Sequence, residues 1–137
     1  MRRLIINADD FGFTAGVNRA IVEAHSRGVV TSSTLMANGP AFSDAVQLTQ
    51  TVPQLSVGCH IVFIDGQPLL APKTVASLVD RDSGAGRFRD GIGGFAVRAL
   101  AGRFDPREIE AEAIAQIRRI QAAGIVVSHR YLLVGYN

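Results

Sequence analysis

Short apolar runs alternate with amphipathic segments along this chain of 137 residues. The runs predict strands, and the segments whose apolar residues recur every three or four positions predict helices. The expected strands are residues 4–8, 29–36, 55–64 and a fourth from 125 onward, and the expected helices are residues 17–27, 42–51 and 105–124. Strands that alternate with helices in this way are typical of a parallel sheet with helices packed outside it. The sequence therefore predicts an α/β fold, with residues 1–137 forming a single domain.

The stretch that follows the third expected strand has no regular period. Residues 65–94 are rich in glycine and proline, and they predict irregular structure with one short helical piece at 75–79. The glycines at 84–94 neither follow a strand nor open a helix as a phosphate-binding loop must, so they indicate a mobile loop.

Two adjacent carboxylates, Asp9 and Asp10, follow the first apolar run and precede Gly12. Neighbouring acids at the carboxyl end of a buried strand repel each other and are costly to desolvate, so they indicate a bound cation or a shared proton. In strand geometry their side chains point to opposite sides, and at the turn they take two roles, metal ligand and general base. The alternative is that one acid caps the helix beginning near Thr14 while the other is solvated.

His60 lies near the middle or the end of the third expected strand, among apolar neighbours. An isolated imidazole in such a setting is more often a hydrogen-bonded core residue than a ligand. Ligands of parallel α/β folds bind at the carboxyl ends of the strands, however, and His60, Asp9 and Asp10 all fall at such ends. Both interpretations of His60 stay open at this point, whereas the adjacent Cys59 is expected in the core.

Composition and charge exclude several classes of protein. Hydrophobic residues make up 47% and charged residues 19% of the chain, which is typical of a globular rather than a disordered protein. The net charge is only +2 and no basic run is present, which argues against nucleic acid as a partner. No apolar stretch approaches the roughly 20 residues that span a bilayer. The single cysteine, Cys59, has no partner for an internal disulfide, so a cytoplasmic location is expected.

Several stretches give the chain a resemblance to the YdjC-like family of metal-dependent carbohydrate deacetylases, which includes the chitooligosaccharide deacetylases. The most specific of these stretches are residues 7–12, 28–32, 36–39 and 57–60. Residues 17–25 and 37–42 resemble most closely the branch associated with hopanoid biosynthesis, HpnK.

The resemblance implies a (β/α) barrel-like fold of about twice this length, of which this chain is the N-terminal half. It also implies a divalent metal ion, zinc or magnesium, held by an aspartate and two histidines. The implied reaction removes the N-acetyl group from an N-acetylglucosamine-type sugar, carried on a glycolipid in the hopanoid branch. Transferred to this sequence, Asp10 and His60 are metal ligands, and Asp9 is the catalytic base that takes a proton from water.

The end of the chain departs from the family pattern. Where the family has an aspartate and then its third ligand histidine, this sequence has Tyr131 and Leu133, which indicates a C-terminal truncation. A half-barrel has open strand edges and an exposed apolar face, which a homodimer or a separately encoded second half would cover. The alternatives to a working enzyme are a catalytically inactive remnant and half of a split barrel. His129 as a substitute third ligand also stays open.

Overall fold

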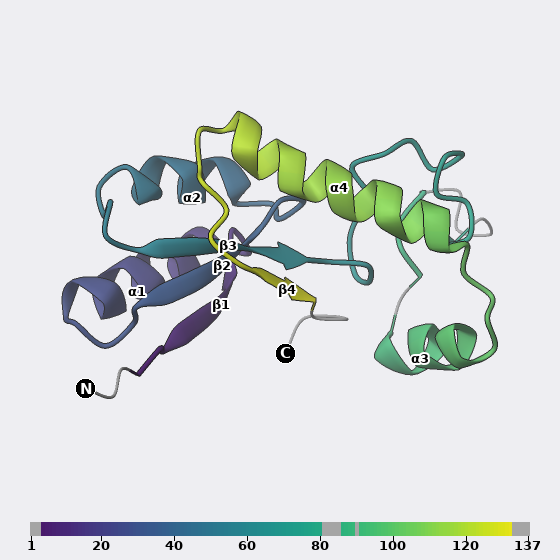
Figure 1. Ribbon diagram of the computed structural model, residues 1–137, viewed down its shortest axis with the longest axis horizontal. Coiled ribbons are helices and arrows are strands. Elements are labelled where there is room, and N and C mark those ends of the chain that lie inside the picture. The colour runs from purple at the N-terminus through teal and green to yellow at the C-terminus, as the bar shows by residue number, and fades with distance from the viewer. Residues whose placement is uncertain (1–3, 81–85, 90, 133–137) are drawn as a thin grey trace.

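The computed structural model describes residues 4–80, 86–89 and 91–132 (Figure 1). Within them, one sheet has the strand order β1-β2-β3-β4, and all neighbouring strands are parallel. The strands are β1 Asn7–Phe11, β2 Ser32–Met36, β3 Ser56–Ile61 and β4 Arg130–Leu132, and the helices are α1 Ala15–Ser26, α2 Phe42–Thr49, α3 Ile92–Leu100 and α4 Pro106–Ala122. The predicted α/β fold with parallel strands is confirmed. None of the described helices is long and apolar enough to cross a membrane.

One face of the sheet packs against helices, and the other is lined by polar side chains. Helices α1, α2 and α4 contact β1, β2 and β3 respectively. Alternate strand residues such as Leu35, Cys59 and Ile61 are buried in the core on the helical side, as predicted for Cys59. The residues between them form the opposite face, called the inner face below. Its polar members are Asn7, Asp9, Ser32, Thr34, Ser56 and His60.

All four strands begin later than the sequence predicts, because a strand needs a partner to receive its hydrogen bonds. β1 begins at Asn7, which pairs with the first residue of β2, and the preceding Leu4 and Ile5 are exposed. β4 begins at Arg130 rather than at 125. The first contact of this segment with β3 is made by Ser128, whose main-chain N–H donates to the carbonyl of Val57 at 2.9 Å.

Helix α3 begins at Ile92, inside the stretch 65–94 where the sequence predicts irregular structure, and continues beyond that stretch to Leu100. Gly91 is its N-terminal cap, so the last glycines of the stretch 84–94 do open a helix, contrary to the expectation. Gly93 and Gly94 lower its intrinsic helix propensity, but the ring of Phe95 packs on that of Phe104 with centroids 4.7 Å apart. Figure 1 shows α3 away from the sheet, near the beginning of α4. The expected helical piece at 75–79 consists of turns instead, and the expected mobile loop at 84–94 lies partly outside the described residues.

The turns that follow β1 and β2 touch at two glycines. Gly12 has a φ of +96°, and its carbonyl accepts a hydrogen bond from the N–H of Ala41 at 2.9 Å. Gly39 lies so close that a Cβ atom there would collide with the carbonyl oxygen of Gly12. This approach fixes the backbone directly beyond Asp10.

We expect Gly39→Ala to lower the free energy of unfolding by about 1–3 kcal/mol, because the added methyl group forces the two turns apart. Gly93→Ala in α3 is the matched control, since a Cβ there would meet no described atom within 4 Å apart from its chain neighbours and the backbone of its own helix. The control should be neutral or should stabilise by up to about 1 kcal/mol. Urea unfolding followed by circular dichroism measures both variants, and equal effects would contradict the close approach.

Candidate active site

β1 contains one residue more than β2 over the stretch where the acids lie. Ala8 pairs with Ser33 and Phe11 pairs with Leu35, so three steps along β1 match two steps along β2. The surplus residue makes a β-bulge, a device that re-aims side chains and is frequent beside active sites. Asp10, within this bulge, has a φ of 63°, in the left-handed region that residues other than glycine rarely adopt.

The bulge brings Asp9 and Asp10 to the same side of the sheet, the inner face. Asp9 is hydrogen-bonded to Thr34, and the carboxylate of Asp10 lies 3.5 Å from Nδ1 of His60. Phe11 then returns to the helical side, where it is fully buried. The opposite orientation expected for regular strand geometry does not apply at these two residues, because one extra residue breaks the alternation of the strand. The three residues predicted for the site, Asp9, Asp10 and His60, do lie together.

Neither acid caps the first helix, contrary to the alternative interpretation. The N-terminal cap of α1 is Thr14, whose hydroxyl oxygen accepts the N–H of Val17 at 3.1 Å. This frees Asp9 and Asp10 from the commonest structural role of an acid before a helix.

Two hydrogen bonds hold the carboxylate of Asp9. Nδ2 of Asn7 and the hydroxyl of Thr34 each donate to Oδ1 of Asp9 at 2.7 Å. The hydroxyl of Ser32 donates in turn to Oδ1 of Asn7 at 2.7 Å. Both bonds to Asp9 reach the same oxygen, so the plane of the carboxylate is fixed and Oδ2 is left to accept a proton. Sequence reasoning missed Asn7 and Thr34, although polar residues inside an expected buried strand were a usable signal.

His60 is only 1% exposed and lies at the carboxyl end of β3. The main-chain N–H of Asp10 donates to its Nδ1 over a long 3.4 Å. Nε2 of His60 and Oδ1 of Asp10 are both buried, and neither has a hydrogen-bond partner among the described residues. Because buried polar atoms are almost always paired, two unpaired atoms on neighbouring side chains indicate a place for a ligand.

Burial lowers the pKa of His60 below its ordinary value of 6.5, and the charges of Asp10 and Asp9 oppose this shift to a smaller extent. His60 is therefore neutral at pH 7 and keeps a lone pair on one ring nitrogen, which is the form that binds metal ions. This property, and the 3.5 Å that separates Nδ1 of His60 from the unpaired Oδ1 of Asp10, favour a ligand over a hydrogen-bonded core histidine.

Asn18 of α1 joins the two turns beside the site and was missed by sequence reasoning. It is fully buried, and its Oδ1 accepts the N–H of Gly12 at 2.7 Å. Its Nδ2 donates to the carbonyl of Ala41 at 3.1 Å and to Oδ2 of Asp44 at 2.7 Å. A buried asparagine on a helix predicts such a network in principle, but its partners depend on the tertiary fold.

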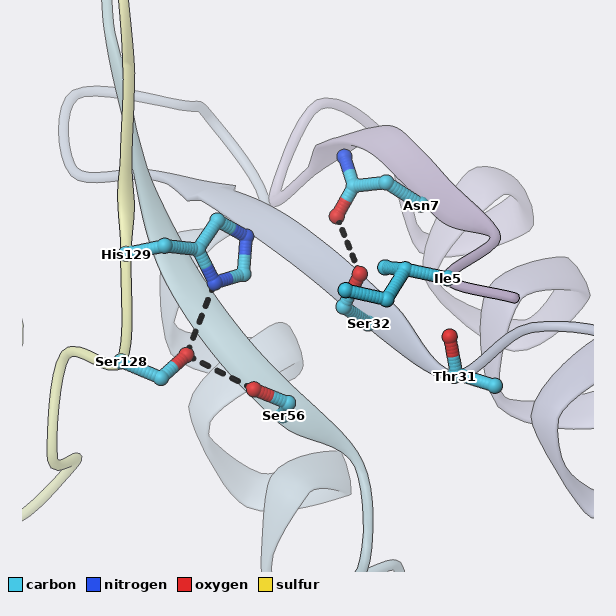
Figure 2. Close-up of a pocket in the computed structure, with 7 residues that line it drawn as sticks. All are labelled: Ile5, Asn7, Thr31, Ser32, Ser56, Ser128 and His129. Carbon is cyan, nitrogen blue, oxygen red and sulfur yellow. Dashed lines mark hydrogen bonds between the residues drawn. The ribbon is translucent and has the colours of Figure 1, made fainter. Parts of the chain in front are cut away.

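The structure places His129 away from His60. His129 precedes the first residue of β4 instead of following the last, and its ring packs over Gly58. Figure 2 shows it beside a hollow of about 650 Å³, where its Nδ1 is hydrogen-bonded to Ser128 at 2.8 Å. The hollow is lined by Ile5, Asn7, Thr31, Ser32, Ser56, Ser128 and His129. Since Asn7, Ser32 and Ser56 each begin a strand, the hollow lies at the opposite end of the sheet from His60.

The described residues bring two potential metal ligands together at the carboxyl end of the sheet, Asp10 and His60. Among residues 4–80, 86–89 and 91–132, no three His, Cys, Asp or Glu side chains are grouped as a metal site. Position 133, where the family pattern has its third ligand, lies outside the described residues.

Comparison with known proteins identifies the class to which this fold and these residues belong. Residues 3–130 match the family model described as YdjC-like protein. The chain therefore belongs to the YdjC-like family.

Relatives in this family carry more specific names. The carbohydrate deacetylase of Brevibacillus brevis is 47% identical over 127 residues, which cover 93% of this chain and 47% of that protein. Carbohydrate deacetylase 1 of Listeria innocua is 41% identical over 127 residues, which cover 93% of this chain and 49% of that protein. The chain thus spans about half the length of the curated relatives it matches.

A solved structure shows the same fold. It is the crystal structure of an Enterococcus faecalis protein assigned to cellobiose-phosphate cleavage, which superposes with a TM-score of 0.81 at 34% sequence identity. The match covers 94% of this chain and 47% of that chain. The strand and helix arrangement described above is therefore that of half of a larger relative.

We expect the metal-free protein to lose stability as the pH falls below 6.5. Because the pKa of His60 is lower in the folded than in the unfolded state, the unfolded state binds more protons between these two values. The stabilisation by neutral His60 is thus complete above the unfolded pKa of about 6.5 and is lost as the pH falls through the folded pKa. Urea unfolding at pH 5 to 8 should show a shallower pH dependence in His60→Gln, and an unchanged slope would contradict a buried neutral His60.

Proposed function

We propose that this chain carries the N-terminal part of a carbohydrate deacetylase site, in which Asp10 and His60 bind a divalent metal ion and Asp9 is the catalytic base. The observation that carries the proposal is the buried Oδ1 of Asp10, which has no hydrogen-bond partner among the described residues and lies 3.5 Å from Nδ1 of His60, next to the oriented carboxylate of Asp9. The names of the relatives support the substrate class, and the geometry of the three side chains supports the roles that the resemblance implies.

The two side chains fit a metal ion by their chemistry. A carboxylate oxygen and a neutral imidazole nitrogen are common ligands of Zn²⁺, and they suit Mg²⁺ less well because it prefers oxygen and water. Catalytic zinc sites commonly have three protein ligands, so this pair forms a partial site. The remaining ligand would come from a segment beyond the described residues or from a partner chain.

The metal ligands and the catalytic base have different roles in the proposed amide hydrolysis. A divalent cation, when bound, supplies a Lewis acid that polarises the amide carbonyl and makes water more acidic. Asp9, held by Asn7 and Thr34 through Oδ1, accepts the proton of the attacking water on Oδ2. Because its carboxylate plane is fixed before substrate arrives, Asp9 needs no reorganisation in the transition state.

We further propose an N-acetylglucosamine-type sugar as substrate, with a hopanoid glycolipid as the specific case. This finer assignment rests on the resemblance of residues 17–25 and 37–42 to the hopanoid branch. A cytoplasmic location is part of the same proposal and rests on Cys59, which is buried and is the single cysteine of the sequence.

A second candidate is a chain without catalytic activity of its own. The specific observation in its favour is the partial ligand set, since the described residues supply two ligands and not three. In this case the chain is either a truncated remnant or half of a split barrel that needs its second half.

We expect Asp10→Asn to abolish binding of Zn²⁺ while the fold is retained, because the substitution removes the charged ligand and relieves the repulsion between Asp9 and Asp10. Asp105→Asn is the matched control, since asparagine is as good an N-terminal helix cap as aspartate. Isothermal titration calorimetry with Zn²⁺ measures the stoichiometry. Unchanged zinc binding in Asp10→Asn would refute the assignment of Asp10.

We also expect the active form to be a homodimer, in which a second copy covers the inner face and completes the ligand set. Analytical ultracentrifugation, zinc content and acetate release from N-acetylated chitooligosaccharides should be measured on one sample. A dimer that holds zinc and releases acetate supports the deacetylase. A monomer that neither holds zinc nor releases acetate supports the inactive chain instead.

A further inference from the structure

Helix α4 turns a row of polar side chains toward the protein interior. Glu108, Glu112 and Gln116 are spaced by four residues, so they lie on one side of the helix. Glu112 and Gln116 are 0% exposed. Charged and amide side chains are seldom buried so completely without specific partners, and the proposal for the active site gives this row no role.

Gln116 binds the chain where β3 ends. Its Oε1 accepts the main-chain N–H of Val62 at 2.9 Å, and its Nε2 donates to the carbonyl of the same residue at 2.8 Å. One side chain thus pairs with both main-chain groups of one residue, as an adjacent strand would. Val62 directly follows the last residue of β3 and lies two positions after His60.

The other members of the row hold the irregular segment that follows β3. Glu112 accepts the N–H groups of Leu69 at 2.9 Å and Leu70 at 3.0 Å, and Glu108 accepts the N–H of Ser77 at 2.7 Å. The Nε2 of Gln116 also donates to Glu112 at 3.0 Å. The segment therefore receives from α4 the hydrogen bonds that regular secondary structure would otherwise provide.

The segment held in this way stands beside the candidate site. It leaves the carboxyl end of β3, and the carbonyl of Gln67 accepts a hydrogen bond from Nδ2 of Asn38, in the turn that follows β2, at 3.1 Å. Its apolar side chains add a small core of their own, in which Phe63 meets Phe88 edge to face with centroids 6.3 Å apart. Residues at the carboxyl ends of parallel strands form the walls of ligand sites.

We infer that Gln116 is a positioning residue for His60, and that Glu112 and Glu108 hold the following segment as a preformed wall of the same site. Among the described residues, the polar contacts of the His60 ring are long, at 3.4 and 3.5 Å through Nδ1. Its orientation therefore depends on the backbone at the end of β3, which Gln116 fixes two residues later. The inference rests on the proposed function because that function gives His60 its role as a metal ligand. The two hydrogen bonds between Gln116 and Val62 do not depend on that function.

The test compares Gln116→Met with Gln121→Met in the metal-free protein. Methionine keeps the length of the side chain and removes both hydrogen bonds to Val62, whereas Gln121 is exposed on the same helix. We expect hydrogen exchange at the Val62 amide to become at least about tenfold faster in Gln116→Met. The ring signals of His60 in heteronuclear NMR should shift or broaden in the same variant. Gln121→Met should change neither quantity.

A purely structural role for Gln116 would raise exchange at Val62 and leave the His60 signals unchanged, and this result would overturn the inference. If Gln116→Met does not fold, amide hydrogen exchange of the folded, unmodified protein tests whether Gln116 holds the backbone at Val62. Val62 should then be protected like the Cys59 amide, which donates to the carbonyl of His129 at 2.9 Å within the sheet. Much faster exchange at Val62 than at Cys59 would also overturn the inference.

Zinc titration separates this inference from the proposed function. If the unmodified protein binds Zn²⁺, Gln116→Met should weaken binding by about tenfold. Equal affinity in the two proteins would refute the positioning role alone. An unmodified protein that binds no zinc, but whose His60 signals respond to Gln116→Met, would refute the metal site and support the positioning role.

Discussion

A one-residue bulge in β1 decides which side chains the sheet presents at its carboxyl end. Under strict alternation, one of the two acids would point into the core, where an unpaired carboxylate is costly. With the bulge, Phe11 keeps its buried place while Asp9 and Asp10 share the inner face. The left-handed backbone at Asp10 costs about 1–3 kcal/mol. Hydrogen bonds at both the N–H and the carbonyl of Gly12 hold the chain in this conformation.

Buried polar groups around this bulge fall into two kinds. Asn18 and Gln116 are buried with their hydrogen bonds satisfied, and each ties a segment beyond a strand end to a helix. Asp10, which is partly buried, and His60, which is buried, each have one buried atom without a hydrogen-bond partner among the described residues. The first kind gives rigidity and the second gives binding capacity. The ligands of a site keep their geometry before a metal ion or a substrate arrives only if the surrounding structure is rigid.

The sequence predicts the α/β class and the meeting of Asp9, Asp10 and His60, because hydrophobic period and strand ends are local properties. It does not predict the bulge, because the bulge depends on pairing between β1 and β2. These two strands are distant in the chain: Asn7 of β1 and Ser32 of β2 are 25 residues apart. The two hydrogen bonds between Gln116 and Val62 join residues 54 positions apart, so the spacing of Gln116 along α4 does not reveal its partner. Position 133, where the family pattern has its third ligand, lies outside the described residues. The expectation for the third ligand therefore rests on the resemblance alone.

The central claim is that Asp10 and His60 bind one metal ion together on the inner face. Anomalous X-ray diffraction from zinc-loaded crystals tests this claim most directly. The account predicts an anomalous peak at about 2.0–2.2 Å from both a carboxylate oxygen of Asp10 and a ring nitrogen of His60. A peak at His25 or His129 instead, with none between Asp10 and His60, would contradict it.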